Sequence, residues 1–247
     1  MRLYPVFVLA AVSLACAATV DKDPAFGPNH AFRLESSQDS FGERAHGISE
    51  MVDGRPVVYP LPQSDVAEYK KLHPDEFGIA HLTEKNYDRE ELIGPHQLDG
   101  DNLWFGKSFY HGEGMRGVGA FGYFDTTARQ YQLFSPPEIA AWQVSAILVE
   151  KDSVWLGLDH FGEDISTSPG GLLRWDRATR KVRHYPLEFS VLSIEHRGKL
   201  LHMDATRGYA ELELSTDTVR RYEMRHLKTG ASAVVPVAKF PPPPTRH

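Results

Sequence analysis

Between residues 95 and 224 the chain alternates apolar and polar positions, and no amphipathic period of helix length occurs there. In QYQLF (130–134) and KVRHY (181–185), an apolar or aromatic residue returns at every second position. This alternation is typical of strands with one buried face. The DTTAR and DRATR stretches just before these segments carry the Asp and Thr chemistry of tight hairpin turns. The pattern therefore predicts short antiparallel strands joined by hairpins.

The strands recur as a unit. DNLWFG (101–106) is echoed 51 residues later by DSVWLG (152–157), and GAFGYFDTTARQYQLF (119–134) aligns without a gap on GGLLRWDRATRKVRHY (170–185). A weaker third copy contains GKLLHMD (198–204), with the spacing shortened to 46 residues if Leu201 is matched to Trp155. Agreement of aromatic, turn and glycine positions in one register indicates an internal repeat.

Each copy is expected to contain four strands, which in the first copy lie at about 95–99, 102–107, 118–124 and 130–135. Four strands per unit and a period of 40 to 50 residues are typical of a β-propeller blade. Trp104 and Trp155 hold the same place in two copies, so we expect them to pack between neighbouring blades. The matched glycines at 106, 157, 119 and 170 are expected where backbones approach closely.

The repeat unit resembles the blades of two-component-regulator propeller repeats. The shared pattern is a Trp and a Gly two residues apart, followed by Gly, an apolar run, Asp, Thr and a Tyr near the end. The LLRWDRATRKVRHYPL segment is also similar to the blades of streptogramin (virginiamycin B) lyases. The resemblance covers about residues 95–224, with a partial blade at 44–62. It implies an all-β chain folded as a small β-propeller of four-stranded antiparallel blades. The lyase family's histidine and acid pattern has no counterpart that can be placed on this sequence.

The flanking segments decide the number of blades, which we expect to be four or five. Asp53-Gly54 predicts a hairpin between two strand-like runs, and NHAFRLES (29–36) is an earlier strand of the same blade. Residues 64–92 are charged and poor in β-branched residues, so a helical or irregular insertion is expected there. SAVVPVAKF (232–240) is expected to be a last strand that completes the first blade. If the ring does not close within one chain, a homodimer would close it.

The N-terminus predicts export. Arg2 precedes an apolar run from Val6 to Ala15, and small residues follow, as in a secretory signal peptide over residues 1–18. The apolar run is too short to span a membrane. Lipoprotein anchoring at Cys16 is disfavoured because Ser13 stands where a large aliphatic residue is usual. The propeller domain then covers 22–240, the proline-rich tail 241–247, and the expected location is the periplasm or the extracellular space.

The composition of the chain excludes several classes of partner and activity. The net charge is −6, which argues against nucleic acid, whose binding requires a basic face. Cys16 is the single cysteine, so a mature chain cleaved after residue 17 or 18 has no disulfide and depends on core burial alone. No P-loop, serine nucleophile elbow or zinc-finger spacing occurs.

Two long segments between the second and third strands are the candidate site. KSFYHGEGMRGV (107–118) and LDHFGEDISTSPG (158–170) hold equivalent positions in adjacent copies, so they should emerge side by side. Hairpin loops usually have two to five residues, which makes both unusually long. The candidate ligand-binding residues are Tyr110, His111, Glu113, Arg116, His160, Phe161, Glu163 and Asp164.

These observations leave two functions open. The first is an exported, non-enzymatic binding protein whose loop face, residues 107–118 and 158–169, contacts a protein, a glycan or a small molecule. The second is a lyase or hydrolase in which His111, Glu113, His160 and Glu163 surround a divalent metal, since imidazole and carboxylate groups suit such an ion. No cofactor is implied beyond that metal.

Overall fold

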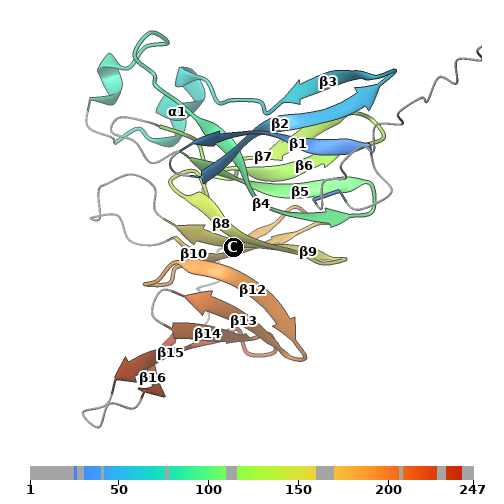
Figure 1. Cartoon of the computed structure of the whole chain (residues 1–247). Helices are drawn as coiled ribbons and strands as arrows, with labels where there is room; N and C mark the ends of the chain where they lie inside the picture. Colours follow the sequence, from blue (N-terminus) through green and yellow to red (C-terminus); the bar gives the residue numbers. More distant parts are fainter. Residues whose placement is uncertain are drawn as a thin grey trace, which may run out of the picture.

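The computed structural model describes residues 25–26, 31–39, 42–75, 78–109, 116–159, 170–205, 208–226 and 232–240. Within these ranges the chain forms three antiparallel sheets stacked one on another (Figure 1). The first sheet contains β1 (Phe32–Asp39), β2 (Gly42–Val52), β3 (Arg55–Pro60), β4 (Glu91–Asp99), β5 (Asn102–Phe109), β6 (Phe121–Asp125) and β7 (Gln130–Phe134). The second contains β8 (Gln143–Val149), β9 (Ser153–Asp159), β10 (Gly171–Asp176) and β11 (Val182–Tyr185). The third contains β12 (Val191–Arg197), β13 (Leu200–Ala205), β14 (Gly208–Glu213), β15 (Thr218–His226) and β16 (Ser232–Phe240).

The strand pairing repeats with the period seen in the sequence. Trp104 on β5 pairs with Tyr123, and Trp155 on β9 pairs with Arg174, both pairs displaced by 51 residues. The four strands expected in the first copy are thus present as β4 to β7. Each of the three sheets contains the same four-stranded meander, with neighbours in sequence paired in space.

The third copy follows a different register from the one the sequence suggested. The turn between β12 and β13 closes at Arg197 and Leu200, as the turn between β8 and β9 closes with the Glu150 N–H donating to the Ser153 carbonyl at 2.9 Å. Leu200 is therefore equivalent to Ser153, and His202 is equivalent to Trp155. The spacing from Trp155 is 47 residues, and the match to Leu201 was wrong. The low sequence similarity of this copy allowed a slip of one residue, which reverses the face of every side chain.

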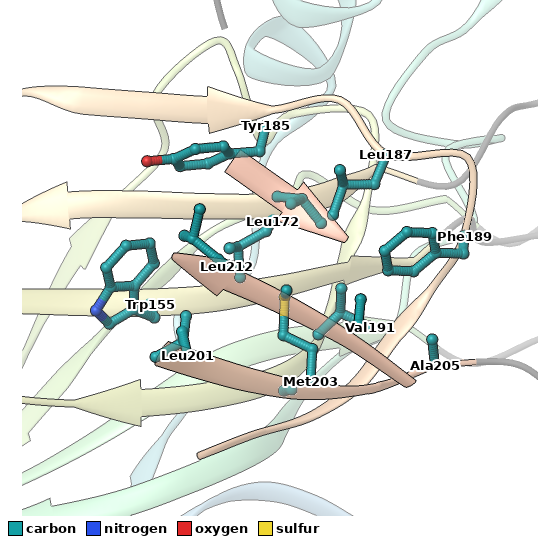
Figure 2. Packing of buried hydrophobic residues seen from close by; sticks show 13 residues of the cluster. Trp155, Leu172, Tyr185, Leu187, Phe189, Val191, Leu201, Met203, Ala205 and Leu212 are labelled. Carbon is teal, nitrogen blue, oxygen red and sulfur yellow. The ribbon is translucent and has the colours of Figure 1, made fainter. Parts of the chain in front are cut away.

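The sheets pack through two apolar layers. Trp104 lies between the first and second sheets, and Trp155 lies between the second and third, each no more than 3% exposed. Figure 2 shows the second layer, in which Trp155, Leu172 and Tyr185 face Leu201, Met203 and Leu212 across the gap between the sheets. The expectation that both tryptophans pack between repeats is confirmed.

One glycine in the first sheet and one in the second allow the following sheet to pack at close range. A β-carbon on Gly106 would lie 2.2 Å from the Val144 Cβ of β8, and one on Gly157 would lie 2.6 Å from the Val191 carbonyl oxygen of β12. Such distances are below any real contact, so only glycine fits. The same interlock therefore joins the first sheet to the second and the second to the third.

The N-terminal strands cover the outer face of the first sheet. The predicted Asp53-Gly54 hairpin is present, with both residues at positive φ (50° and 74°), and it joins β2 to β3. Phe32 and Ile48 from these strands pack with Leu103, Phe105 and Phe124 in one buried cluster. A single ladder pair, Ala45 with Ile93, joins β2 to β4, so β1 to β3 continue the first sheet and pack over the face of β5 and β6. The partial blade expected from the sequence is therefore not a separate sheet.

The opposite end of the stack is polar. The strand at 232–240 is present as β16, but it pairs with β15 in the third sheet and does not complete the first blade. On the outer face of the third sheet, Ser193, Glu195, His202, Tyr209 and Tyr222 occupy the positions that Ala146, Leu148, Trp155, Leu172 and Tyr185 occupy in the second sheet. The apolar packing face has thus become a partly exposed polar one, as in the terminal unit of a stacked array.

A hydrogen-bonded carboxylate at the junction of the second and third sheets gives a testable pH dependence. Glu150 Oε1 lies 2.5 Å from the His196 Nδ1, and Glu150 Oε2 accepts from the Trp155 Nε1 at 3.0 Å. Burial raises the pKa of Glu150, but these hydrogen bonds outweigh it, so the net pKa lies below its ordinary value of 4.5. A carboxyl group whose pKa is lower in the folded than in the unfolded state stabilises the protein at pH values above the unfolded-state pKa. This stabilisation is lost as the pH falls through the folded-state pKa.

We therefore expect stability to fall as the pH drops below about 5, with a contribution from this carboxyl of less than about 1 kcal/mol because it is partly exposed. Urea denaturation between pH 7 and 3 should show a shallower acid slope for Glu150→Gln than for the wild type. Equal slopes would show that the pair makes no contribution.

Candidate functional site

Seven of the eight candidate binding residues lie outside the described residues: Tyr110, His111, Glu113, His160, Phe161, Glu163 and Asp164. The structure therefore leaves their convergence, and the metal site built from His111, Glu113, His160 and Glu163, as predictions. Arg116 is described. It is partly buried, and its N–H donates to the Asp88 carbonyl at 2.9 Å, which attaches the returning chain to the segment before β4.

The strand ends that carry the two segments lie close together. At the end of β5, the Phe109 N–H donates to the Gln143 Oε1 at 3.3 Å. Gln143 begins β8 and pairs in the ladder with Asp159, the last residue of β9. Gln143 thus joins the points where segments 110–115 and 160–169 begin, the first through its side chain and the second through its backbone. We call this end of the stack the loop end, defined by Phe109, Gln143 and Asp159 and by the returns at Gly119 and Gly170.

The two segments also return beside a common turn. A β-carbon on Gly119 would lie 1.9 Å from the Ile139 carbonyl oxygen, and one on Gly170 would lie 2.7 Å from the Trp142 Cγ. The Gly119 N–H donates to the Ala140 carbonyl at 3.0 Å. These contacts confirm that Gly119 allows close backbone approach, whereas Gly170 makes room for the side chains of Leu158 and Trp142. They place the 139–142 turn between the two returning strands.

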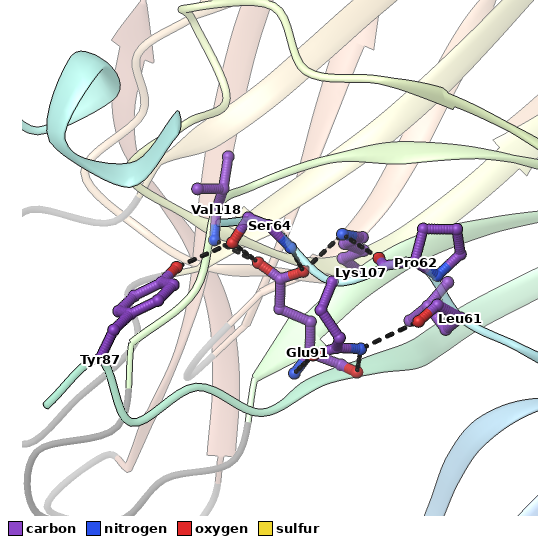
Figure 3. Close-up of polar contacts among 8 residues, drawn as sticks. Leu61, Pro62, Ser64, Tyr87, Glu91, Lys107 and Val118 are labelled. Atoms are coloured by element: carbon purple, nitrogen blue, oxygen red, sulfur yellow. Dashed lines mark hydrogen bonds and ion pairs between the residues drawn. The ribbon is translucent and has the colours of Figure 1, made fainter. Parts of the chain in front are cut away.

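A buried carboxylate anchors the first segment at both ends (Figure 3). Glu91, at the start of β4, is 1% exposed. Its Oε2 accepts from the Lys107 Nζ at 2.5 Å, and its Oε1 accepts from the Val118 N–H at 2.8 Å. Lys107 and Val118 are the first and last residues of the candidate segment 107–118. The carboxylate therefore holds the base of this segment closed.

Ser64 completes the set of donors to Glu91. Its N–H donates to Oε2 at 2.9 Å and its hydroxyl to Oε1 at 2.5 Å, so the carboxylate accepts four hydrogen bonds. The Lys107 Nζ also donates to the Pro62 carbonyl at 2.8 Å, and the Tyr87 hydroxyl lies 2.8 Å from the Ser64 Oγ. Burial raises the pKa of Tyr87 to about 12, so this phenol stays protonated at neutral pH.

This network is suited to rigidity and not to catalysis. A general acid or base must reach the proton it transfers, whereas Glu91 and Lys107 are enclosed and have strong partners. A buried pair is stable only when its hydrogen-bonding groups are satisfied, as the four donors to Glu91 achieve here. The sequence reasoning missed both residues. The available signal was the position of Lys107 directly after the apolar run LWFG. A lysine that continues a buried strand needs a buried anion as its partner.

The base of the second segment carries further polar contacts. The His184 Nε2 lies 2.6 Å from the Gly170 carbonyl oxygen, and the His184 ring is 5.6 Å from that of Trp142. The Ser190 hydroxyl donates to Asp159 Oδ1. The chain that returns from this segment into β10 is thus attached to β11. The end of β9, where the segment begins, is attached to the start of the third sheet.

Two further observations concern the described part of the chain alone. There, no group of three or more His, Cys, Asp or Glu side chains is arranged to hold a metal ion. Among the same residues, no helix has the length and apolar character needed to cross a membrane. The helical elements of this part of the chain are α1 (Val66–Leu72) and a 3-10 turn at Ile79–His81, both between β3 and β4.

Comparisons with known proteins assign no family. No family model matches the sequence, and no curated protein matches it. Among solved structures, the chain is similar to the extracellular domain of a candidate one-component system from B. thetaiotaomicron, with a TM-score of 0.38 and 12% sequence identity. The match covers 85% of this chain and 31% of that one, so the chain spans about a third of the neighbour's length.

Proposed function

We propose that this chain is an exported, non-enzymatic binding protein whose loop end contacts a protein, glycan or small-molecule ligand. The observation that carries the proposal is the anchoring of the loop end. Glu91 fixes both ends of segment 107–118, and Gln143 joins the strands from which 110–115 and 160–169 begin. Binding residues are often placed on loops that a rigid scaffold positions. The leader-like N-terminus supports export.

We further propose that the three sheets are propeller-type blades in an open array. Their common four-stranded meander and the repeated glycine interlock support this relation. The covered outer face of the first sheet and the polar outer face of the third give the array two finished ends. At the described positions of β12 to β15 the outer face of the third sheet is polar and would not pack against a second copy to close the ring, so the proposal implies a monomer.

The test combines ligand arrays with elemental analysis of the purified protein. Wild-type protein and a His111→Ala/His160→Ala variant are applied to glycan and peptide arrays. We expect the wild type to retain a small set of ligands that the variant loses by at least about tenfold, a change of 1.4 kcal/mol. The variant Glu195→Gln, on the remote third sheet, is the control and should bind like the wild type.

The metal content of the same samples tests the alternative, a metal-dependent lyase or hydrolase. We expect less than a tenth of an equivalent of any divalent metal and no change in melting temperature after EDTA dialysis. One equivalent of metal that is lost in the His111→Ala/His160→Ala variant would contradict the proposal and favour the enzyme. Arrays that show no ligand for the wild type would contradict binding of glycans and peptides at the loop end.

A further inference from the structure

A basic depression lies at the other end of β10 from the loop end. It has a volume of about 170 Å³ and is lined by Arg174, Asp176, Thr179, Lys181, Val182 and Arg183. These residues belong to β10, β11 and the turn between them. Three cations and one carboxylate give the lining a charge of +2, in a chain whose net charge is −6. The depression is too small for a drug-sized ligand and has the size of a single polar group with its substituent.

Two of the cations lie directly opposite each other. Arg174 on β10 pairs with Arg183 on β11 in the antiparallel ladder. Like charges in this position destabilise a sheet, because their β-carbons are about 5 Å apart. Arg183 is neutralised by Asp217 at 2.8 Å. Arg174 has no ion-pair partner among the residues that the structure describes.

Arg174 is also held in place with an unsatisfied donor. Its guanidinium carbon lies 5.3 Å from the centre of the Trp155 ring, a cation–π contact that fixes the side chain. Its Nε is buried and has no hydrogen-bond acceptor within the described part of the chain. A buried donor without an acceptor destabilises the folded state.

The carboxylate of the depression is already engaged. Asp176 Oδ1 accepts from the Thr179 N–H at 2.7 Å, the Thr179 hydroxyl at 2.8 Å and the Ala178 N–H at 3.1 Å. The Thr179 contacts lower the pKa of Asp176, so it is ionised at neutral pH. Its role is to hold the hairpin turn. Among the residues that the structure describes, no carboxylate forms an ion pair with Arg174 or Lys181, although the charge of Asp176 also attracts Arg174.

The repeat shows that the fold does not require these cations. In the first sheet, 51 residues earlier, the positions of Arg174, Lys181 and Arg183 are taken by Tyr123, Gln130 and Gln132. That hairpin forms with the same register and no cationic side chain at these three places. The opposed pair of cations is therefore specific to the second sheet, since Tyr123 faces Gln132 in the first sheet and Glu211 faces Arg220 in the third.

We propose that this depression binds an oxyanion group, a carboxylate, phosphate or sulfate, carried by a small molecule. The terminal Nη–H groups of Arg174 form a planar fork that suits two oxygens of one such group. Lys181 supplies a second charge from the edge of the depression. This site is separate from the loop end, so the two proposals stand or fall independently.

The experiment measures binding of sodium phosphate, sulfate and glucuronate by isothermal titration calorimetry, with sodium chloride at equal ionic strength as the reference. We expect saturable binding of at least one oxyanion, with a dissociation constant of about 1 mM or tighter. Arg174→Gln and Arg174→Lys should each weaken it at least about tenfold, since lysine keeps the charge and loses the fork. Comparing phosphate and sulfate with glucuronate distinguishes a site for tetrahedral oxyanions from a site for an acidic sugar.

Arg220→Gln, which removes one exposed positive charge from the third sheet, is the matched control and should bind like the wild type. Lys181→Gln changes a side chain at the rim, so it should keep the melting temperature and weaken binding several-fold even if the Arg174 variants fold poorly. Heats equal to those of chloride, or equal binding by wild type and Lys181→Gln, would overturn the proposal. The His111→Ala/His160→Ala variant should bind the oxyanion normally.

Discussion

Replacing Glu91 with leucine is expected to lower the free energy of unfolding by about 3–5 kcal/mol. The substitution leaves the buried ammonium of Lys107 without its counter-ion, and it removes the acceptor of the Ser64 and Val118 N–H groups. Desolvated charges and donors without partners are among the most destabilising changes in a folded protein. Chemical denaturation with urea, followed by tryptophan fluorescence, measures the loss.

Lys107→Met should be less harmful than Glu91→Leu, because it removes one of four donors to the carboxylate and leaves the other three in place. Glu195→Gln is the surface control, since its partner Arg197 is 53% exposed and such pairs contribute at most about 1 kcal/mol. A loss of less than about 1 kcal/mol for Glu91→Leu would show that water reaches this carboxylate. It would also remove the argument that the base of segment 107–118 is rigid.

The repeat was predictable because its signals are local. Alternation, turn residues and the two tryptophan-glycine pairs all depend on a few neighbouring positions. They placed the four strands of the first copy to within about four residues, and they gave the register of the second copy. The third copy lacks the tryptophan, and its register depends on the turn at Gly198, which has a positive φ of 65°. Aligning that turn with the one between β8 and β9 would have identified His202 as the equivalent of Trp155.

The end of the array was not predictable from the repeat alone. Whether a strand such as 232–240 pairs with the first blade or with its neighbour depends on contacts between distant segments. The composition of the third copy held the relevant signal, however. Glu195, His202 and Glu211 replace Leu148, Trp155 and Arg174, so the face that packs in the second sheet is polar in the third. A polar terminal face is what a stacked array needs where it meets water.

The strand ends that bound the two candidate segments were predictable from the sequence, but the residues that support those ends were not. Loop length alone identified 107–118 and 158–170, since the repeat fixed where the strands end. Glu91 and Ser64 lie 16 or more residues from Lys107 in the sequence, and no local pattern links them. Their association depends on the path of the chain through α1 and the 3-10 turn, where Tyr69, Leu82 and Tyr87 pack with Val118.

Replacing Gly106 with alanine is expected to lower the free energy of unfolding by about 3 kcal/mol, the upper part of the range for overpacked cores. The new methyl group would lie 2.2 Å from the Cβ and Cγ1 of Val144, which is 1% exposed and cannot move into solvent. The first and second sheets would have to separate along the whole layer that contains Trp104. Urea denaturation measures the change, and tryptophan fluorescence reports on the layer itself.

The double variant Gly106→Ala/Val144→Gly separates a steric cause from a loss of strand flexibility. Removing the valine side chain creates room for the methyl group, so the double variant should be more stable than the sum of the two single changes predicts, by about 1–2 kcal/mol. Gly198→Asn is the control, because a β-carbon there meets nothing within 4 Å and asparagine tolerates its positive φ. Strict additivity in the double variant would show that the glycine serves the backbone of β5 and not the contact between sheets. The expected coupling would identify this interlock, repeated at Gly157 and Val191, as the element that sets the spacing of the stack.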